Sequence, residues 1–454
     1  MSLSRFESML KTNDVYFFDA TEFEEIVQHY LNIGKHTLAK KAIHLGLDQH
    51  PHSIALKLLK VEVFIFDDNF EDAVKLINQI EAVEPHNDEV FFQKAVILSK
   101  YKKHQEAIDV LKQSLDYVED PIDVWAMIGM EYLYLDDFDN ARLNFVKCIE
   151  VDFEDYSSLY NIVYCYEMQE DFEQSITFLR KYIDKNPYSE VAWHQLGKQY
   201  FELEDYENAL KAFDYAVIID ETFIGGYLEK AKSLEQLGHF EKAIENYLIT
   251  LELDDPTAFA YVRIGECYEN LEAPGTAIEF YKKAVYEDPL LDKAWLLLIN
   301  LYCEADNYNK ALYYINKALQ IDDSNIIYWR KYAEINSKLN FFDETVKAFQ
   351  TCIELGDVDI EVYLALADVL IYLGEFKNSI KVLIKAKNTY KEFAELEYRL
   401  FGLFMIQGEE QYAFIHLKNA LCIDCEGLSL IEDLFPSVTE NEKVQRIISQ
   451  FLCN

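Results

Sequence analysis

Residues 190–223 read EVAWHQLGKQYFELEDYENALKAFDYAVIIDETF. Small residues stand at places 8 and 20 of this stretch, and bulky aromatic residues at places 4, 11 and 24: Gly197, Ala209, Trp193, Tyr200 and Phe213. Residues that recur every three or four positions lie on one face of an α-helix. The stretch therefore predicts two consecutive helices that approach each other closely where the small residues meet.

The same features recur every 34 residues along the chain. A small residue keeps this step without insertion or deletion at Ala39, Ala73, Ala107, Ala141, Ser175, Ala209, Ala243, Ala277, Ala311, Thr345, Ser379 and Ala413. A fixed period of this length is typical of stacked helical repeats, in which each unit packs only on its neighbours. The 454 residues therefore predict one elongated solenoid rather than several globular domains.

Other residue types keep the same phase when the first 34-residue unit is set at 20–53. The four tryptophans of the chain share place 4: Trp125, Trp193, Trp295 and Trp329. Glycines mark place 15, the turn between the two helices: Gly34, Gly238, Gly374 and Gly408. Prolines mark place 32, between units: Pro51, Pro85, Pro187 and Pro289. Next to the inner turn, three aspartates are expected to cap the second helix: Asp137, Asp171 and Asp205.

This pattern resembles the tetratricopeptide repeat, most closely at Gln195–Tyr200 with Ala209, Phe213 and Ala216 following. The resemblance covers roughly residues 20–427. It implies an all-α fold, a right-handed superhelical α-solenoid of about twelve 34-residue helix hairpins. Among the departures from the pattern, the unit that begins at Ile54 has Lys57 at the aromatic place, and the last unit has Glu397 there.

Segments at both ends are expected to cap the solenoid, because a repeat array must close its terminal apolar faces. Residues 1–19 predict an N-terminal cap, with a short helix that carries Phe6, Met9 and Leu10. Residues 428–454 predict C-terminal capping helices. There the capping box Thr439–Glu442 precedes an apolar stripe of Val444, Ile447, Ile448, Phe451 and Leu452.

The net charge of −39 comes from 81 acidic and 42 basic residues. Because nucleic-acid binding depends on Lys and Arg that neutralise phosphates, this balance argues against a nucleic-acid partner. It also argues against binding to an anionic membrane surface. The first residues show no signal-peptide core, and no stretch of about 18 apolar residues occurs, so a cytoplasmic location is expected.

Signals for catalysis are weak throughout the sequence. No glycine-rich phosphate loop and no HExxH motif occur. Cys148 and Cys352 stand at a place that holds alanine in other units, so both are expected to be buried. Cys422 and Cys425 form a lone CxxC, with Cys453 the only nearby third thiol. We expect no cofactor and no metal, and a thiol- or zinc-dependent enzyme is the remote alternative.

In the resembled family the first helices of the hairpins line a concave groove that binds extended segments of partner proteins. Its lining places are 2, 5, 6, 9, 12 and 13. In units two to five these places hold the candidate apolar anchors Phe66, Phe92, Tyr134, Tyr160 and Tyr164. In units six to ten they hold the candidate charge partners Lys198, Lys232, Arg263, Arg330 and Lys331. The sequence thus predicts a non-catalytic scaffold whose protein partner presents acidic and apolar residues.

Two alternatives remain beside this hypothesis. The cations can pair with neighbouring glutamates such as Glu235, Glu266 and Glu334, and the aromatic residues can contact adjacent helices. The chain can also be a self-associating structural protein whose surface is covered by a second copy. The clamp for chaperone tails is not present, because Asn300 at place 9 has Leu296 where that clamp needs lysine.

Overall fold

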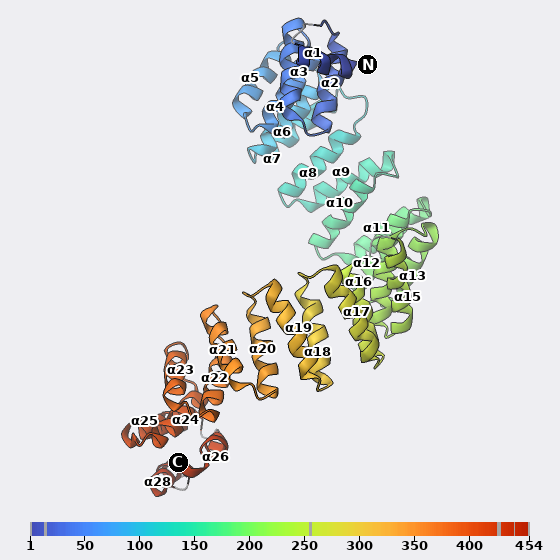
Figure 1. Cartoon of the computed structure of the whole chain (residues 1–454). Helices are drawn as coiled ribbons and strands as arrows, with labels where there is room; N and C mark the ends of the chain where they lie inside the picture. The colour runs from blue at the N-terminus through green and yellow to red at the C-terminus, as the bar shows by residue number, and fades with distance from the viewer. Residues whose placement is uncertain (1, 13–15, 254–256, 425–427, 440, 453–454) are drawn as a thin grey trace. The chain divides into compact units, whose positions relative to one another are not determined.

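The computed structural model describes residues 2–12, 16–253, 257–424, 428–439 and 441–452. Every extended regular element in these ranges is an α-helix, and no strand occurs among them (Figure 1). The helices follow one another as antiparallel hairpins stacked side by side. The all-α class predicted from the sequence is confirmed.

The first helix of each hairpin begins at place 1 of its unit and is 13 residues long. Within the described ranges these helices are α2 (Ala20–Asn32), α4 (Ile54–Phe66), α6 (Asp88–Lys100), α8 (Ile122–Tyr134), α10 (Tyr156–Met168), α12 (Glu190–Glu202), α14 (Ile224–Gln236), α16 (Ala258–Asn270), α18 (Asp292–Glu304), α20 (Ile326–Lys338), α22 (Ile360–Tyr372) and α24 (Ala394–Ile406). Their starts keep the 34-residue step of the sequence.

The second helix of each hairpin begins at place 17. These helices are α3 (His36–Gln49), α5 (Phe70–Glu81), α7 (His104–Ser114), α9 (Phe138–Val151), α11 (Phe172–Lys185), α13 (Tyr206–Ile219), α15 (Phe240–Leu253), α17 (Pro274–Glu287), α19 (Tyr308–Ile321), α21 (Phe342–Glu354), α23 (Phe376–Thr389) and α25 (Glu410–Ile423). The predicted N-caps are confirmed, since Asp137, Asp171 and Asp205 each accept a backbone N–H three residues ahead, at 3.2–3.3 Å.

The turn inside each hairpin is left-handed at place 15. Gly34, Gly238, Gly374 and Gly408 have φ between 70° and 77° there. The other hairpins hold non-glycine residues with φ between 51° and 61°: Asp68, Lys102, Asp136, Glu170, Glu204, Glu272, Asp306 and Asn340. Such a conformation costs an L-residue about 1–2 kcal/mol. The packing of the two helices therefore imposes this turn, and glycine is not required for it.

The chain divides into two compact units, Met1–Ser233 and Leu234–Asn454, with the boundary inside α14. We call them the N-terminal unit and the C-terminal unit. A single solenoid over residues 20–427 and its right-handed superhelix stay predictions across that boundary.

Glycine at place 8 marks the closest approach of the two helices of a hairpin. A Cβ atom added to Gly197 would lie 2.5 Å from the Phe213 ring, and one added to Gly129 would lie 2.7 Å from the Phe145 ring. The same clash would occur between Gly265 and Tyr281. These three rings have at most 1% of their surface exposed. The aromatic residue at place 24 therefore fills the space that the missing side chain leaves.

We expect Ala209→Leu to lower the free energy of unfolding by about 1–3 kcal/mol, because it overpacks the contact between α12 and α13. Ala209 has no exposed surface. Chemical denaturation of the full chain measures the effect. Glu207→Leu is the control, since it adds leucine at an exposed place of the same helix and should change stability by less than about 0.5 kcal/mol. Equal stability of the two variants would show that the assigned register is wrong.

Tryptophan at place 4 ties a hairpin to the turn before it. The indole Nε1–H of Trp193 donates to the carbonyl oxygen of Pro187 at 3.0 Å, and that of Trp295 donates to Pro289 at 2.9 Å. Trp329 makes the same bond to Asp323, at 2.7 Å. The acceptor is at place 32 of the preceding unit each time. Because the acceptor is a backbone carbonyl, the bond forms with proline or with another residue at that place.

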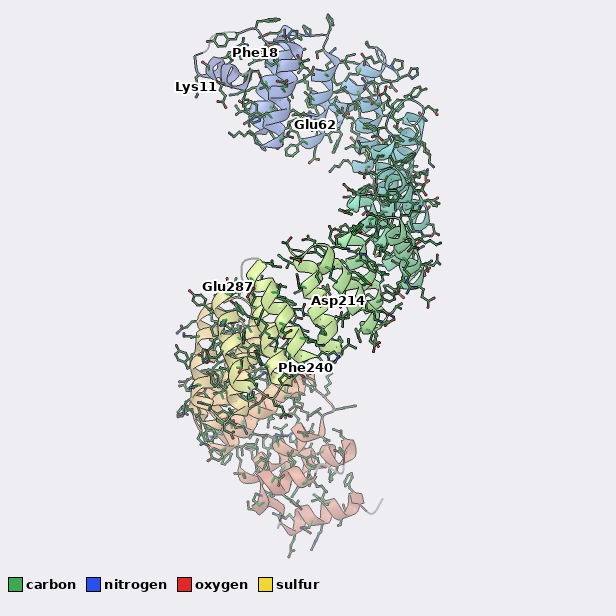
Figure 2. The ribbon with its side chains drawn as sticks, turned by 90° about the vertical axis from the view of Figure 1, so that its right-hand side faces the viewer. Lys11, Phe18, Glu62, Asp214, Phe240 and Glu287 are labelled. Atoms are coloured by element: carbon green, nitrogen blue, oxygen red, sulfur yellow. The ribbon has the colours of Figure 1, made fainter. Side chains whose placement is uncertain are left out.

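The N-terminal segment packs on the first hairpin. Helix α1 (Ser2–Thr12) buries Phe6 completely, with its ring 6.1 Å from that of Phe18 and 6.2 Å from that of Phe23. Figure 2 shows Phe18 beside this helix at the outer end of the N-terminal unit. The segment thus closes the apolar face of α2 and α3.

The C-terminal segment closes the other end through α26 (Ser429–Leu434), α27 (Pro436–Thr439) and α28 (Glu442–Leu452). The ring of Phe435 packs directly on Gly402 of α24. The predicted capping box at Thr439–Glu442 includes residue 440, which lies outside the described residues, and the next helix begins at Glu442 itself. Thr439 ends α27, and the helix that follows begins after Asn441, whose Oδ1 accepts the N–H of Lys443 at 2.9 Å.

Candidate functional site

Places 5 and 9 lie one turn apart on the same face of each first helix, so they form two parallel rows across the stack. In the N-terminal unit the row at place 5 is Glu24, Leu58, Phe92, Ala126, Tyr160, His194 and Leu228. The row at place 9 is Gln28, Glu62, Val96, Met130, Tyr164, Lys198 and Lys232. We call this face the inner surface. Along the chain it changes from acidic to apolar and aromatic, and then to basic.

Tyr160 and Tyr164 form the most accessible aromatic pair of this surface. They are one turn apart on α10, and 44% and 45% of their surface is exposed. Phe92 lies two hairpins earlier and is half-buried against the core formed by α6, α7 and α8. The structure therefore places these three predicted anchors on one face of the N-terminal unit.

Phe66 and Tyr134 occupy a different position. Each is the last residue of its first helix and contacts a histidine that begins the second helix of the preceding hairpin. The Phe66 ring stacks on His36 with centroids 3.8 Å apart, and the centroids of Tyr134 and His104 are 5.1 Å apart. The alternative in which aromatic residues contact adjacent helices thus describes these two residues.

Four of the five predicted cations are held in ion pairs. These are Lys232 with Glu229, Arg263 with Glu235 and Glu266, Arg330 with Asp357 and Asp359, and Lys331 with Glu334. The Arg330 guanidinium is bidentate to Asp357, at 2.5 and 2.6 Å, and reaches Asp359 at 2.7 Å. It therefore fixes the turn before α22. The expected basic half is thus largely neutralised by carboxylates around it.

Lys198 differs from these four cations, since no described carboxylate lies within ion-pair distance of it. One turn before it on α12, His194 has no hydrogen-bond partner for either ring nitrogen in the described part of the chain. Burial lowers the pKa of His194 to about 4, and Lys198 and Lys232 also lower it while Glu229 raises it. His194 is therefore neutral at pH 7, and the positive charge at this position belongs to Lys198.

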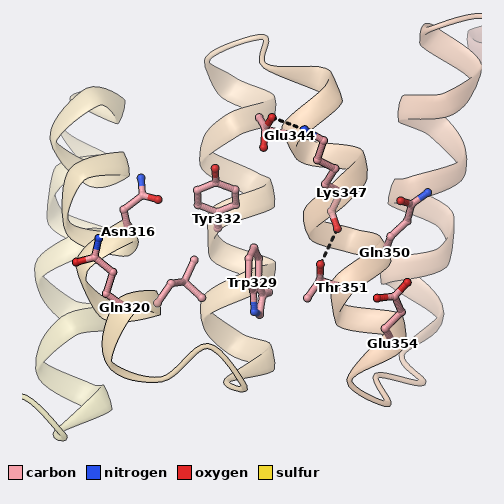
Figure 3. Close-up of a pocket in the computed structure, with 10 residues that line it drawn as sticks. Asn316, Gln320, Trp329, Tyr332, Glu344, Lys347, Gln350, Thr351 and Glu354 are labelled. Atoms are coloured by element: carbon pink, nitrogen blue, oxygen red, sulfur yellow. Dashed lines mark hydrogen bonds and ion pairs between the residues drawn. The ribbon is translucent and has the colours of Figure 1, made fainter.

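The C-terminal unit has a hollow where α20 is flanked by α19 and α21. Figure 3 shows Trp329 and Tyr332 of α20 between Gln320 on one side and Lys347 on the other. The hollow has a volume of about 540 Å³. Lys347 is paired with Glu344 at 2.7 Å.

The sequence-based prediction overlooked the acidic part of the inner surface. Glu24, Glu62 and Glu89 stand at places 5, 9 and 2 and line one hollow with Leu58. The sequence could have indicated this acidic part, since places 2, 5 and 9 belong to the same set of lining places from which the aromatic anchors were chosen. The acid excess of the whole chain made the carboxylates look like ordinary surface residues.

The expected cysteine environments are found where the structure describes them. Cys148 and Cys352 have no exposed surface, and burial raises the pKa of both thiols. Cys422 is an exposed free thiol. Cys425 and Cys453 lie outside the described residues, so the structure does not place the CxxC pair.

The described residues contain no group of three or more His, Cys, Asp or Glu placed to hold a metal ion. None of their helices combines the length and the apolar character needed to cross a membrane.

Sequence profiles of the tetratricopeptide repeat match several separate parts of the chain. The matched residues are 122–155, 157–189, 191–222, 228–292 and 360–392. All of these segments coincide with hairpins of the structure.

Similar proteins include BBSome complex member BBS4 of Bos taurus, which is 22% identical over 391 residues, or 84% of this chain and 74% of that protein. TPR repeat-containing protein MJ1428 of Methanocaldococcus jannaschii is 22% identical over 387 residues, which cover 78% of this chain and 67% of that protein. Among solved structures, the C-terminal part of a TPR repeat-containing protein from Cytophaga hutchinsonii has a TM-score of 0.41 at 17% identity, and covers 53% of this chain and 99% of that one.

Proposed function

Since this chain is a tetratricopeptide repeat protein, we propose that it is a non-catalytic scaffold that binds an extended segment of a partner protein along the inner surface of its N-terminal unit. A cytoplasmic location, as expected from the sequence, is part of this proposal. The relative BBS4 is named as a member of the BBSome complex, and membership of a protein assembly is consistent with the scaffold function proposed for this chain.

The exposed pair Tyr160 and Tyr164 carries the proposal. Tyrosine is enriched among the residues that dominate binding energy, because it gives a large contact area with few rotatable bonds. Phe92 adds an apolar face nearer to the N-terminus, and Lys198 adds a cation beyond the tyrosines. A partner segment with apolar residues at the tyrosines and an acidic residue at Lys198 matches this order.

We expect the double variant Tyr160→Ala/Tyr164→Ala to lose its partner in affinity purification from native cells. Truncation of one such anchor costs about 2 kcal/mol, which weakens binding about 30-fold. Tyr188→Ala is the matched control, because Tyr188 is 80% exposed and lies outside the inner places. Recovery of the same partners in equal yield by both variants would contradict the proposed site.

Light scattering separates this function from self-association. A scaffold with a separate partner is expected to keep the mass of one chain at micromolar concentrations. A mass that rises with concentration would favour the structural alternative instead.

A further inference from the structure

The first three hairpins form a hollow of about 430 Å³ on the inner surface of α2, α4 and α6. Its floor is apolar and comes from α4: Ala55, Leu58 and Leu59. All of its lining residues occupy places 2, 5, 6 or 9 of their units. Figure 2 shows Glu62 at the edge of these helices away from Phe18. We call this hollow the acidic pocket.

The rim of the acidic pocket carries four carboxylates and no basic residue. They are Glu24, Glu25, Glu62 and Glu89. No ion pair to a described lysine, arginine or histidine neutralises any of them. Burial and the neighbouring Glu89 raise the pKa of Glu62, as expected for carboxylates gathered without a counter-charge. This contrasts with Arg263, Arg330 and their partners in the C-terminal unit.

Gln93 gives the second, independent observation. Its side chain lines the pocket with only 6% of its surface exposed. Its Nε2 donates to the carbonyl oxygen of Leu58 at 3.2 Å and to Glu89 Oε1 at 3.0 Å, which fixes the orientation of the amide. Its Oε1 is left without a donor in the described part of the chain. A buried acceptor without a partner costs about 1–3 kcal/mol, so an N–H group that reached Oε1 through the wall of the pocket would be favoured.

We infer that the acidic pocket binds an arginine side chain of the partner segment, with apolar residues next to it in that segment. A guanidinium offers five N–H donors in a plane, enough for Glu62, Glu89 and Gln93 together. The aliphatic part of an arginine packs on apolar surface, and the leucine floor provides that surface. This inference rests on the proposed function, because it assigns the chemistry of the partner where it meets the first three hairpins.

The occupant follows from charge and shape together. A bare divalent ion needs converging ligands, and the described residues contain no group of three acidic or metal-binding side chains in such an arrangement. A cationic group on an aliphatic chain can contact both the carboxylates of the rim and the apolar floor. The segment that the inner surface binds is therefore basic at α2, α4 and α6, apolar at Tyr160 and Tyr164, and acidic at Lys198.

The test measures binding of blocked peptides to the full chain by fluorescence anisotropy. One peptide alternates leucine with arginine, and its matched partner alternates leucine with glutamine. We expect the arginine peptide to bind at least about tenfold more tightly, which corresponds to 1.4 kcal/mol. We expect Glu62→Gln/Glu89→Gln to remove this preference to within about twofold, because both changes keep side-chain volume and remove charge.

The control is Glu71→Gln/Glu173→Gln, which removes the same charge from exposed places on the second helices α5 and α11. It should keep the arginine preference. Equal loss in both variants would reduce the effect to overall charge and overturn the inference. Absence of any preference for the arginine peptide in the wild-type chain would also overturn it. The proposed function is tested separately, because the Tyr160→Ala/Tyr164→Ala result does not depend on the acidic pocket.

Discussion

Phe213→Ala is expected to lower the free energy of unfolding by about 3–5 kcal/mol, which is the range for emptying a buried aromatic site. The Phe213 ring has no exposed surface and covers Gly197 on the partner helix. Its removal leaves α12 and α13 in contact with a void, because Gly197 has no side chain that could fill it. Urea denaturation followed by circular dichroism measures the loss.

A double-mutant cycle combines Phe213→Ala with Gly197→Leu. Alone, this change overpacks the hairpin and should cost about 1–3 kcal/mol. Combined with Phe213→Ala, leucine occupies the space that the ring has left, so the double variant should be more stable than the sum of the two single effects by at least about 1 kcal/mol. Strictly additive effects would show that the two residues do not share one site.

Gly402→Leu is expected to displace the C-terminal cap. The ring of Phe435 rests on Gly402 without room for a Cβ atom. Overpacking of this contact should cost about 3 kcal/mol, which is about a hundredfold in the opening equilibrium. Hydrogen exchange of α26, α27 and α28 should accelerate by that factor, while α10 and α12 keep their protection.

Gly275→Leu is the control for this experiment, since Gly275 is also a helical glycine and has open space around its Cβ position. It should leave exchange of the C-terminal helices unchanged. Unchanged exchange in Gly402→Leu as well would mean that Phe435 does not hold the cap in place.

The hairpins could be predicted because packing constrains the residue type at each place. Only a small residue fits at place 8 beside a ring such as Phe213, and tryptophan at place 4 reaches the carbonyl of Pro187. These constraints repeat with the period, so helix starts follow from residue spacing. The left-handed turn at place 15 could be predicted from the sequence only where glycine stands there. Eight described hairpins adopt the same conformation with other residues, which do not indicate it.

The candidate site was harder to predict. The repeat register indicates which side chains lie on the inner surface, but it does not indicate which residues they pair with. From their places in the repeat, 9 and 5, Lys232 and Arg330 were predicted to form part of a basic surface. The structure shows that Glu229 and Asp357 neutralise them. A long side chain selects among several carboxylates within reach, and the sequence does not specify which. The free Gln93 Oε1 likewise depends on two hydrogen bonds that join α4 and α6.

Acidic residues gather at three of the left-handed turns of the N-terminal unit, whereas the hairpin before them carries Lys102 and Lys103 at this position. Three successive hairpins present adjacent carboxylates there: Asp136 and Asp137, Glu170 and Asp171, Glu204 and Asp205. Because packing, and not glycine, imposes the turn, place 15 accepts charged residues at a conformational cost of about 1–2 kcal/mol each. Two copies that met at these turns would repel each other at distances up to a Debye length, about 8 Å at physiological ionic strength. These acidic turns thus contribute to the colloidal stability of the chain.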